Sequence, residues 1–137
     1  MLYNKSMQDN KKKILIVDDD KFLLNMYSIK FEKSGFDVSV ATSGVDALDI
    51  LHNGLVPDVI VMDLIMPVMD GFAMFENIKK EKLSPNAVYI MLTNQGLLSD
   101  INKAKEMGAH GYIVKATTIP SEVVEEVLDI YNKNNKK

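Results

Sequence analysis

The sequence predicts a doubly wound α/β fold built on a five-stranded parallel sheet. Short β-branched apolar runs alternate along the chain with segments whose apolar residues recur at helical spacing. Four of the five runs are apolar on both faces, as expected for strands covered by helices above and below. Such alternation requires right-handed crossovers between parallel strands. At 137 residues, the chain is long enough for one domain and too short for two.

Each expected strand is a short run rich in Ile and Val. The runs are 13–18, 37–41, 58–63, 87–93 and 111–115. The segments with helical spacing are 22–31, 45–51, 72–78, 97–107 and 123–131. Glycines follow three of these segments, at Gly35, Gly54 and Gly108, where helix C-caps are expected. Pro120 and Glu122 indicate where the last helix begins.

Charge is distributed unevenly along the chain. The formal net charge is −3, and all 16 basic residues are Lys. The segment 14–132 holds nine Lys against 18 acidic residues, so the acidic excess lies in the body of the chain. An acidic body argues against binding to nucleic-acid phosphates, and no direct nucleic-acid partner is expected. The Lys-rich ends, 1–11 and 133–137, are expected to be flexible tails around a domain at 12–132.

Membrane and disulfide chemistry are not indicated by the sequence. No apolar run approaches the roughly 20 residues of a membrane span. The polar segment 1–13 lacks the apolar core of a signal peptide. The absence of Cys excludes disulfides and thiolate metal sites. We therefore expect a cytoplasmic protein that does not associate with membranes.

Acidic residues lie where the first and third expected strands end. Asp18, Asp19 and Asp20 follow one another at the first strand, and Asp63 ends the third. Because parallel strands bring their carboxyl ends to one edge, these carboxylates would repel one another unless a cation lay among them. Mg²⁺ suits such a cluster of hard oxygen ligands. The sequence predicts a Mg²⁺ site there, with Asp20 instead capping the helix that follows.

Two further polar residues end strands at the same edge. Thr93 ends the fourth expected strand and Lys115 ends the fifth. A hydroxyl donor, an ammonium group and metal-bound carboxylates together favour phosphoryl transfer. In such a site Asp63 attacks phosphorus, while Lys115 and the metal neutralise the phosphoryl oxygens.

These residues lie in four motifs, ILIVDDD, PDVIVMDLIMPVMDG, IMLTN and GAHGYIVK. Together the motifs resemble the receiver domain of two-component response regulators, over about residues 12–132. Four motifs in this order, each at a strand end, make the resemblance specific. The resemblance implies a flavodoxin-like (βα)5 fold with strand order 2-1-3-4-5, and the role of a stand-alone receiver in phosphorelay signalling. Such a domain is a signalling module, with only self-phosphorylation and self-dephosphorylation chemistry.

The resemblance also implies a role for each residue of the site. Asp63 matches the phospho-accepting aspartate, and Lys115 matches the lysine that pairs with the phosphoryl group. Asp18 and Asp19 match the acidic pair that holds Mg²⁺ together with Asp63. The backbone carbonyl of Ile65 would be a further ligand of the ion. Mn²⁺ is expected to substitute for Mg²⁺.

Activation and partners follow from the same resemblance. Thr93 matches the hydroxyl that bonds the phosphoryl group, and Tyr112 matches the aromatic residue that moves inward with it. The phosphoryl donor would be a histidine kinase or a phosphotransfer protein. The surface formed by 97–107, 111–115 and the last helix would then bind a downstream protein. Because the chain has no Arg for acid–Arg pairing, we expect a monomer or a weak homodimer.

Three positions depart from the family pattern. Ala116 follows the lysine where the family usually has a cis proline, and we predict a trans bond because a cis bond before a non-proline costs about 3–4 kcal/mol. Asn94 is larger than the small residue usual after Thr93, and it would narrow access to the site. Ile65 stands where a polar side chain often positions hydrolytic water, and it would slow loss of the phosphoryl group.

Other protein classes remain open at this point. A pseudo-receiver would keep the fold and the partner surface without depending on phosphorylation, and Ala116 and Asn94 favour it. A phosphatase of the haloacid dehalogenase type is disfavoured because Ile65, two residues after Asp63, is not an acid. A flavodoxin is disfavoured because no Ser/Thr/Gly-rich phosphate loop follows the first strand.

Overall fold

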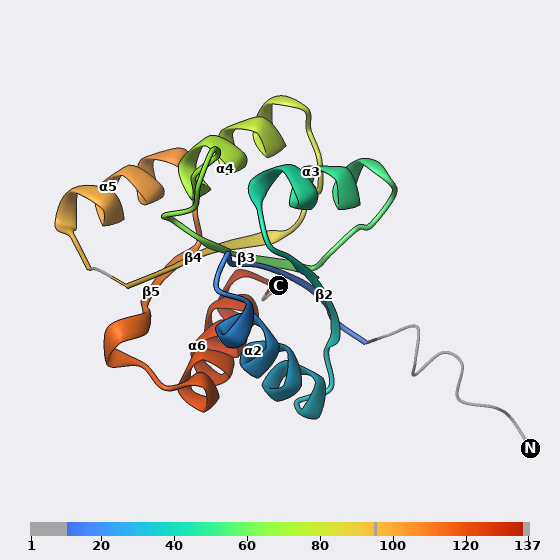
Figure 1. Cartoon of the computed structure of the whole chain (residues 1–137), viewed down its shortest axis with the longest axis vertical. Coiled ribbons are helices and arrows are strands. Elements are labelled where there is room, and N and C mark those ends of the chain that lie inside the picture. Colours follow the sequence, from blue (N-terminus) through green and yellow to red (C-terminus); the bar gives the residue numbers. More distant parts are fainter. Residues whose placement is uncertain (1–10, 95, 136–137) are drawn as a thin grey trace, which may run out of the picture.

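A five-stranded parallel sheet runs through the centre of the protein in the order β2-β1-β3-β4-β5 (Figure 1). The computed structural model describes residues 11–94 and 96–135. The strands are β1 (Lys13–Val17), β2 (Asp37–Ala41), β3 (Val59–Asp63), β4 (Val88–Thr93) and β5 (Gly111–Val114). The predicted fold class and strand order are confirmed. Nearly all of the expected N-terminal tail, 1–11, lies outside the described residues.

Five helices cover the two faces of the sheet. They are α2 (Lys21–Lys33), α3 (Gly44–His52), α4 (Gly71–Lys80), α5 (Leu98–Met107) and α6 (Pro120–Asn134), and a short 3-10 turn, η1, spans Lys115–Thr117. Helices α3, α4 and α5 lie on one face, and α2 and α6 on the other (Figure 1). Within the described residues, none of these helices has the length and apolar character needed to cross a membrane.

The helix ends agree with the capping residues expected from the sequence. The Asp20 side chain accepts a hydrogen bond from the backbone N–H of Leu23 at 3.1 Å, so Asp20 caps α2 as predicted. Pro120 is the first residue of α6, where Glu122 accepts from the backbone N–H of Ile119 at 3.0 Å. The last helix continues to Asn134, two residues into the segment 133–137 that we expected to be a flexible tail. A basic Lys133 in its last turn favours this extension, since cations stabilise helix C-termini.

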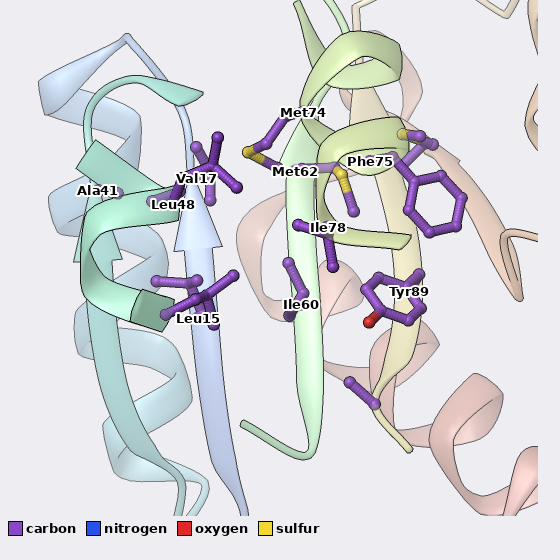
Figure 2. Close-up of a cluster of buried hydrophobic side chains, with 14 of the residues drawn as sticks. Leu15, Val17, Ala41, Leu48, Ile60, Met62, Met74, Phe75, Ile78 and Tyr89 are labelled. Carbon is purple, nitrogen blue, oxygen red and sulfur yellow. The ribbon is translucent and has the colours of Figure 1, made fainter. Parts of the chain in front are cut away.

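Alternation of side chains along the central strands creates two cores. In β1, Leu15 and Val17 pack under α3 and α4, whereas Ile14 and Ile16 pack under α2 and α6. Figure 2 shows the first of these cores, where side chains of β1, β3 and β4 meet those of α3 and α4. Each fully buried Leu or Ile contributes about 1.5–3 kcal/mol. The buried strands are thus rigid supports for whatever follows their carboxyl ends.

The fifth strand differs from the expectation of a strand covered on both faces. Ile113 is buried, but Tyr112 and Val114 are only half-buried. The reason is topological: β5 is an edge strand that pairs with β4 alone. Its apolar sequence therefore leaves partly exposed side chains at this edge.

Candidate functional site

The carboxylates of the first and third strands meet at the carboxyl edge of the sheet. Val17 of β1 pairs with Met62 of β3, so the next residues along each strand, Asp18 and Asp63, lie side by side. Both are buried, at 0% and 6% exposure, whereas Asp19 is exposed. One carboxylate oxygen from each of Asp18, Asp19 and Asp63 lies within 4.8 Å of the other two. This spacing and the hard oxygen donors suit a small divalent cation.

Lys115 supplies the positive charge that balances this cluster. Its Nζ lies 2.7 Å from Asp18 Oδ2 and 3.2 Å from Asp63 Oδ2, and its side chain is only 5% exposed. The residue begins η1, directly after β5, and β4 separates that strand from β3. The lysine side chain therefore crosses the carboxyl end of β4 to reach both carboxylates.

The remaining carboxylate oxygens accept backbone hydrogen bonds. The N–H of Asp20 donates to Asp18 Oδ1 at 2.9 Å, and the N–H of Ile65 donates to Asp63 Oδ1 at 3.3 Å. Each buried aspartate is thus held at both oxygens, by Lys115 on one side and by an amide on the other. The Ile65 side chain is 63% exposed, so it does not contribute to the buried core.

The surroundings of Asp63 make its carboxylate easier to protonate than that of an exposed aspartate. Burial raises the pKa of Asp63 to about 6; the charge of Lys115 opposes this shift and that of Asp18 adds to it. Burial by itself would lower the pKa of Lys115, but its hydrogen bond to Asp18 and the charges of both aspartates leave that pKa raised. Lys115 therefore remains an ammonium, and a metal ion bound at Asp63 would favour the carboxylate form.

The two residues expected to switch lie on neighbouring strands. Thr93 ends β4 and is buried, at 1% exposure. The preceding residue of β4, Leu92, pairs with Asp63. Thr93 therefore lies one residue further along β4 than the position that is paired with Asp63. Tyr112 lies on β5 opposite Met91 of β4, and burial together with the charge of Asp100 raises its pKa.

The departures from the family pattern have distinct structural settings. The structure contains no cis peptide bond in the residues that it describes, so the predicted trans bond between Lys115 and Ala116 is confirmed. Asn94 is exposed. The effects of Asn94 on access and of Ile65 on phosphoryl lifetime stay predictions.

Two positions around the site have constraints that the sequence analysis did not derive. A Cβ on Gly71 would lie 2.5 Å from the backbone oxygen of Asp63, so only glycine fits behind the aspartate. Val68, in the loop after β3, has φ of 69° although its side chain is fully exposed. The constraint at Gly71 had a visible signal in the sequence, the Asp70-Gly71 pair. The conformation of Val68 had none, because Val is unusual at positive φ.

A buried aspartate beside further carboxylates and one lysine, where strand order reverses in a doubly wound sheet, is the arrangement of a phosphorelay signalling domain. The comparison with known families agrees. The model of the response regulator receiver domain matches residues 14–127, and the chain belongs to this family.

Curated relatives are longer than this chain. It is 32% identical over 128 residues to a probable transcriptional regulator, ycf27, of Guillardia theta, and the matched segment covers 93% of this chain and 48% of that protein. It is 33% identical over 103 residues to the DNA-binding dual master transcriptional regulator RpaA of Synechocystis, and here the matched segment covers 75% of this chain and 42% of that protein. The chain thus spans about half the length of these relatives.

Solved structures match the chain over nearly its whole length. A CheY-like receiver domain protein from Methanospirillum hungatei has a TM-score of 0.82 at 27% identity, covering 93% of this chain and 98% of that chain. The chemotaxis protein CheY4 of Vibrio cholerae has a TM-score of 0.81 at 28% identity, covering 88% of this chain and 98% of that chain.

Proposed function

We propose that this receiver domain accepts a phosphoryl group on Asp63 from the phosphohistidine of a histidine kinase or a phosphotransfer protein. The observation that carries the proposal is the position of Asp63. Its carboxylate is buried beside Asp18 and Asp19, which would hold a divalent cation, and beside the Lys115 ammonium, which would neutralise charge on the phosphoryl oxygens.

In the proposed transfer, a carboxylate oxygen of Asp63 attacks phosphorus and forms the P–O bond of an acyl phosphate. The P–N bond of the phosphohistidine breaks, and its electron pair returns to the leaving imidazole. Mg²⁺, or Mn²⁺ in its place, would be held by Asp18, Asp19, Asp63 and the Ile65 carbonyl, and would neutralise charge on the phosphoryl oxygens. Lys115 exchanges its contact with the Asp63 carboxylate for one with the phosphoryl group.

The proposed switch uses Thr93 and Tyr112. The Thr93 hydroxyl bonds the phosphoryl oxygens once they extend beyond Asp63, and the half-buried Tyr112 ring moves inward behind it. Because the phosphoryl group contacts one arrangement better than the other, it shifts the population toward that arrangement. The change is local, since β4 and β5 are neighbouring strands.

The proposed output surface is formed by α5, β5 and α6. Leu97 and Leu98, at the beginning of α5, are 51% and 70% exposed, and they lie only a few residues after Thr93. An exposed apolar pair so close to the switch suits a protein partner whose affinity depends on phosphorylation. We propose a protein as the direct partner of this domain, with the chain itself a monomer or a weak homodimer.

Phosphorylation is tested with acetyl phosphate and with beryllofluoride, each in the presence of Mg²⁺. Intact-protein mass spectrometry should show one added phosphoryl group, lost in Asp63→Asn and retained in the matched control Asp49→Asn, which changes an exposed aspartate of α3. Beryllofluoride should shift amide signals of Thr93 and Tyr112 in a ¹H–¹⁵N spectrum. Unchanged mass and unchanged spectra would refute the proposal and favour a pseudo-receiver. Catalytic turnover of a generic phosphate ester would instead favour a phosphatase.

A further inference from the structure

A groove of about 240 Å³ lies beside the acidic cluster, between the beginning of α3 and the loop that follows β3. Val45 lines it from α3, Pro67 and Val68 line it from the loop, and Asp19 is also part of the lining. Pockets that bind small molecules have volumes of about 300–1,000 Å³. The smaller volume of this groove suits one side chain of a protein partner better than a whole small molecule.

The side chains on both sides of the groove are apolar and exposed. Val68 is fully exposed, at 101%, and Val45 is 47% exposed. Pro67, next to Val68, is exposed as well. A single exposed apolar residue is ordinary in a globular protein, but apolar side chains that line one groove form a surface from which a partner can exclude water.

Val68 occupies a backbone conformation that valine rarely adopts. Met69 N–H donates to Pro67 O at 2.7 Å, and Val68 lies between them with φ of 69°. This is a γ-turn of the rare and strained form, with positive φ at its central residue. Packing within the chain does not compensate for the strain, because the Val68 side chain is fully exposed. Strain of this kind gathers at functional sites, so an apolar side chain kept at this position indicates contact with another molecule.

The floor of the groove is fixed by packing and by hydrogen bonding. Gly44 is buried, and a Cβ on it would lie 2.8 Å from Met69 Sδ, so the two sides of the groove are in close contact here. The Ser43 side chain accepts a hydrogen bond from the N–H of Asp46 at 3.1 Å, which holds the beginning of α3. A preformed groove loses little conformational freedom when a partner binds.

The charges around the groove are acidic. Asp19 is exposed, and no Lys is among the described residues that line the groove. Asp46 and Asp70, which directly follow lining residues in the sequence, are exposed as well. Within the part of the chain that the structure describes, Asp19 has no hydrogen bond or ion pair, so its carboxylate is available to a cationic group.

From the strained Val68, the apolar groove and the available carboxylate of Asp19, we propose that this groove binds a protein segment that presents an apolar side chain next to a Lys or Arg. The apolar side chain would lie between Val45 and Val68, and the cationic group would bond to Asp19. Charge-assisted hydrogen bonds are stronger than neutral ones, so the cationic group would decide which segments bind.

The partner would compete with a metal ion. Asp19 belongs to the cluster of carboxylates that suits a divalent cation, so Mg²⁺ and the partner's cationic group would exclude one another there. Coupling between two ligands is reciprocal, so the partner would lower the affinity for Mg²⁺ by the factor by which Mg²⁺ lowers the affinity for the partner. This partner therefore differs from the phosphoryl donor of the proposed function, whose reaction uses the ion.

The test uses the peptide acetyl-Leu-Arg-amide, titrated into the full chain without Mg²⁺ or a phosphoryl donor and followed in ¹H–¹⁵N spectra. We expect saturable shifts of the amides of Val45, Val68 and Met69, with a Kd in the millimolar range. The matched peptide acetyl-Leu-Glu-amide should cause little shift. At a Mg²⁺ concentration ten times the Kd of the ion, the apparent Kd of the Arg peptide should rise about tenfold. Because no phosphoryl group is involved, this result and the proposed function can fail independently.

Two glycine variants separate the groove from general apolar adhesion. Val68→Gly should weaken binding of the Arg peptide about tenfold, the loss expected for one buried Val side chain, while relieving backbone strain. Val56→Gly removes a side chain that is 68% exposed in the loop before β3 and outside the groove, and it should leave the affinity unchanged. Absence of saturable shifts, equal shifts with the Glu peptide, an affinity independent of Mg²⁺, or equal weakening by the two variants would each overturn the proposal.

Discussion

The ammonium of Lys115 lies 2.7 Å from Asp18 and 3.2 Å from Asp63, so one buried cation is shared by two buried carboxylates. These three side chains come from the ends of β5, β1 and β3. Burying these charges removes each of them from water at a cost in free energy. Their mutual attraction offsets that cost only when all three charges are present. Lys115 therefore has a structural role as well as the role that we propose for it toward the phosphoryl group.

Replacing Lys115 separates these two roles. In Lys115→Met, the carboxylates of Asp18 and Asp63 stay buried without their cation, and the free energy of unfolding should fall by about 3 kcal/mol in the absence of metal. Added Mg²⁺ should restore part of this loss, with a lower apparent Kd than in the wild type, because the lysine no longer competes for the carboxylates. Urea unfolding with and without Mg²⁺ measures both effects. Equal Mg²⁺ affinity in the two proteins would contradict this account.

Gly71 controls the position of Asp63 from behind. In Gly71→Ala the new Cβ would lie 2.5 Å from the backbone oxygen of Asp63 and 2.9 Å from the Leu64 Cα. Because these neighbours are backbone atoms, which cannot move away as a flexible side chain can, we expect a loss of about 2–3 kcal/mol in unfolding free energy. Thermal unfolding measures the loss, and beryllofluoride titration shows whether the site is also impaired.

Gly44→Ala is the matched control for this substitution. Gly44 also begins a helix, and a Cβ there would meet the Sδ of Met69 at 2.8 Å. A methionine side chain rotates away easily, so the destabilisation should be well below that of Gly71→Ala. Comparable losses in the two variants would show that backbone contact with Asp63 is not the cause.

Val68 stores backbone strain next to the site. It has φ of 69° and a fully exposed side chain, so no packing compensates for its conformation. Val68→Gly should therefore raise the free energy of unfolding by about 1 kcal/mol. In contrast, Val45→Gly, at an exposed position in the first turn of α3, should lower it by a similar amount. Chemical denaturation of both variants checks the opposite signs.

The site at the carboxyl edge was predictable because its signals are local. Asp18 and Asp63 directly follow β-branched runs, and the geometry of parallel strands then brings them together. The packing of Phe75, Tyr89 and His110 had no such signal, because these three residues come from separate elements and meet only in the folded protein. The half-burial of Tyr112 likewise depends on β5 being an edge strand, which composition alone does not reveal.

His110 should make stability depend on pH. Partial burial lowers the pKa of His110 below its ordinary value, so the unfolded chain takes up a proton more readily than the folded one. Stability is therefore fully present above the ordinary histidine pKa and is lost as the pH falls through the folded value. Protonation also removes the acceptor for the N–H of Tyr89. The decline in unfolding free energy from about pH 8 to about pH 5 should be smaller in His110→Gln, and an identical decline would exclude this origin.

The exposed side chain of Ile65 should set the lifetime of the acyl phosphate. Ile65 N–H bonds Asp63 Oδ1 at 3.3 Å, so this residue lies beside the carboxylate that we propose to be phosphorylated. Its apolar side chain offers no group to orient attacking water. Ile65→Asn supplies an amide that can do so, and phospho-Asp63 should then decay severalfold faster, a fraction of the roughly 10²-fold available from a fully positioned group. Release of inorganic phosphate after removal of acetyl phosphate gives the rate. Val68→Asn is the control, because it introduces the same amide in the same loop at a residue that does not contact Asp63 through its N–H. An equally faster decay in this variant would show that the side chain of Ile65 does not set the lifetime.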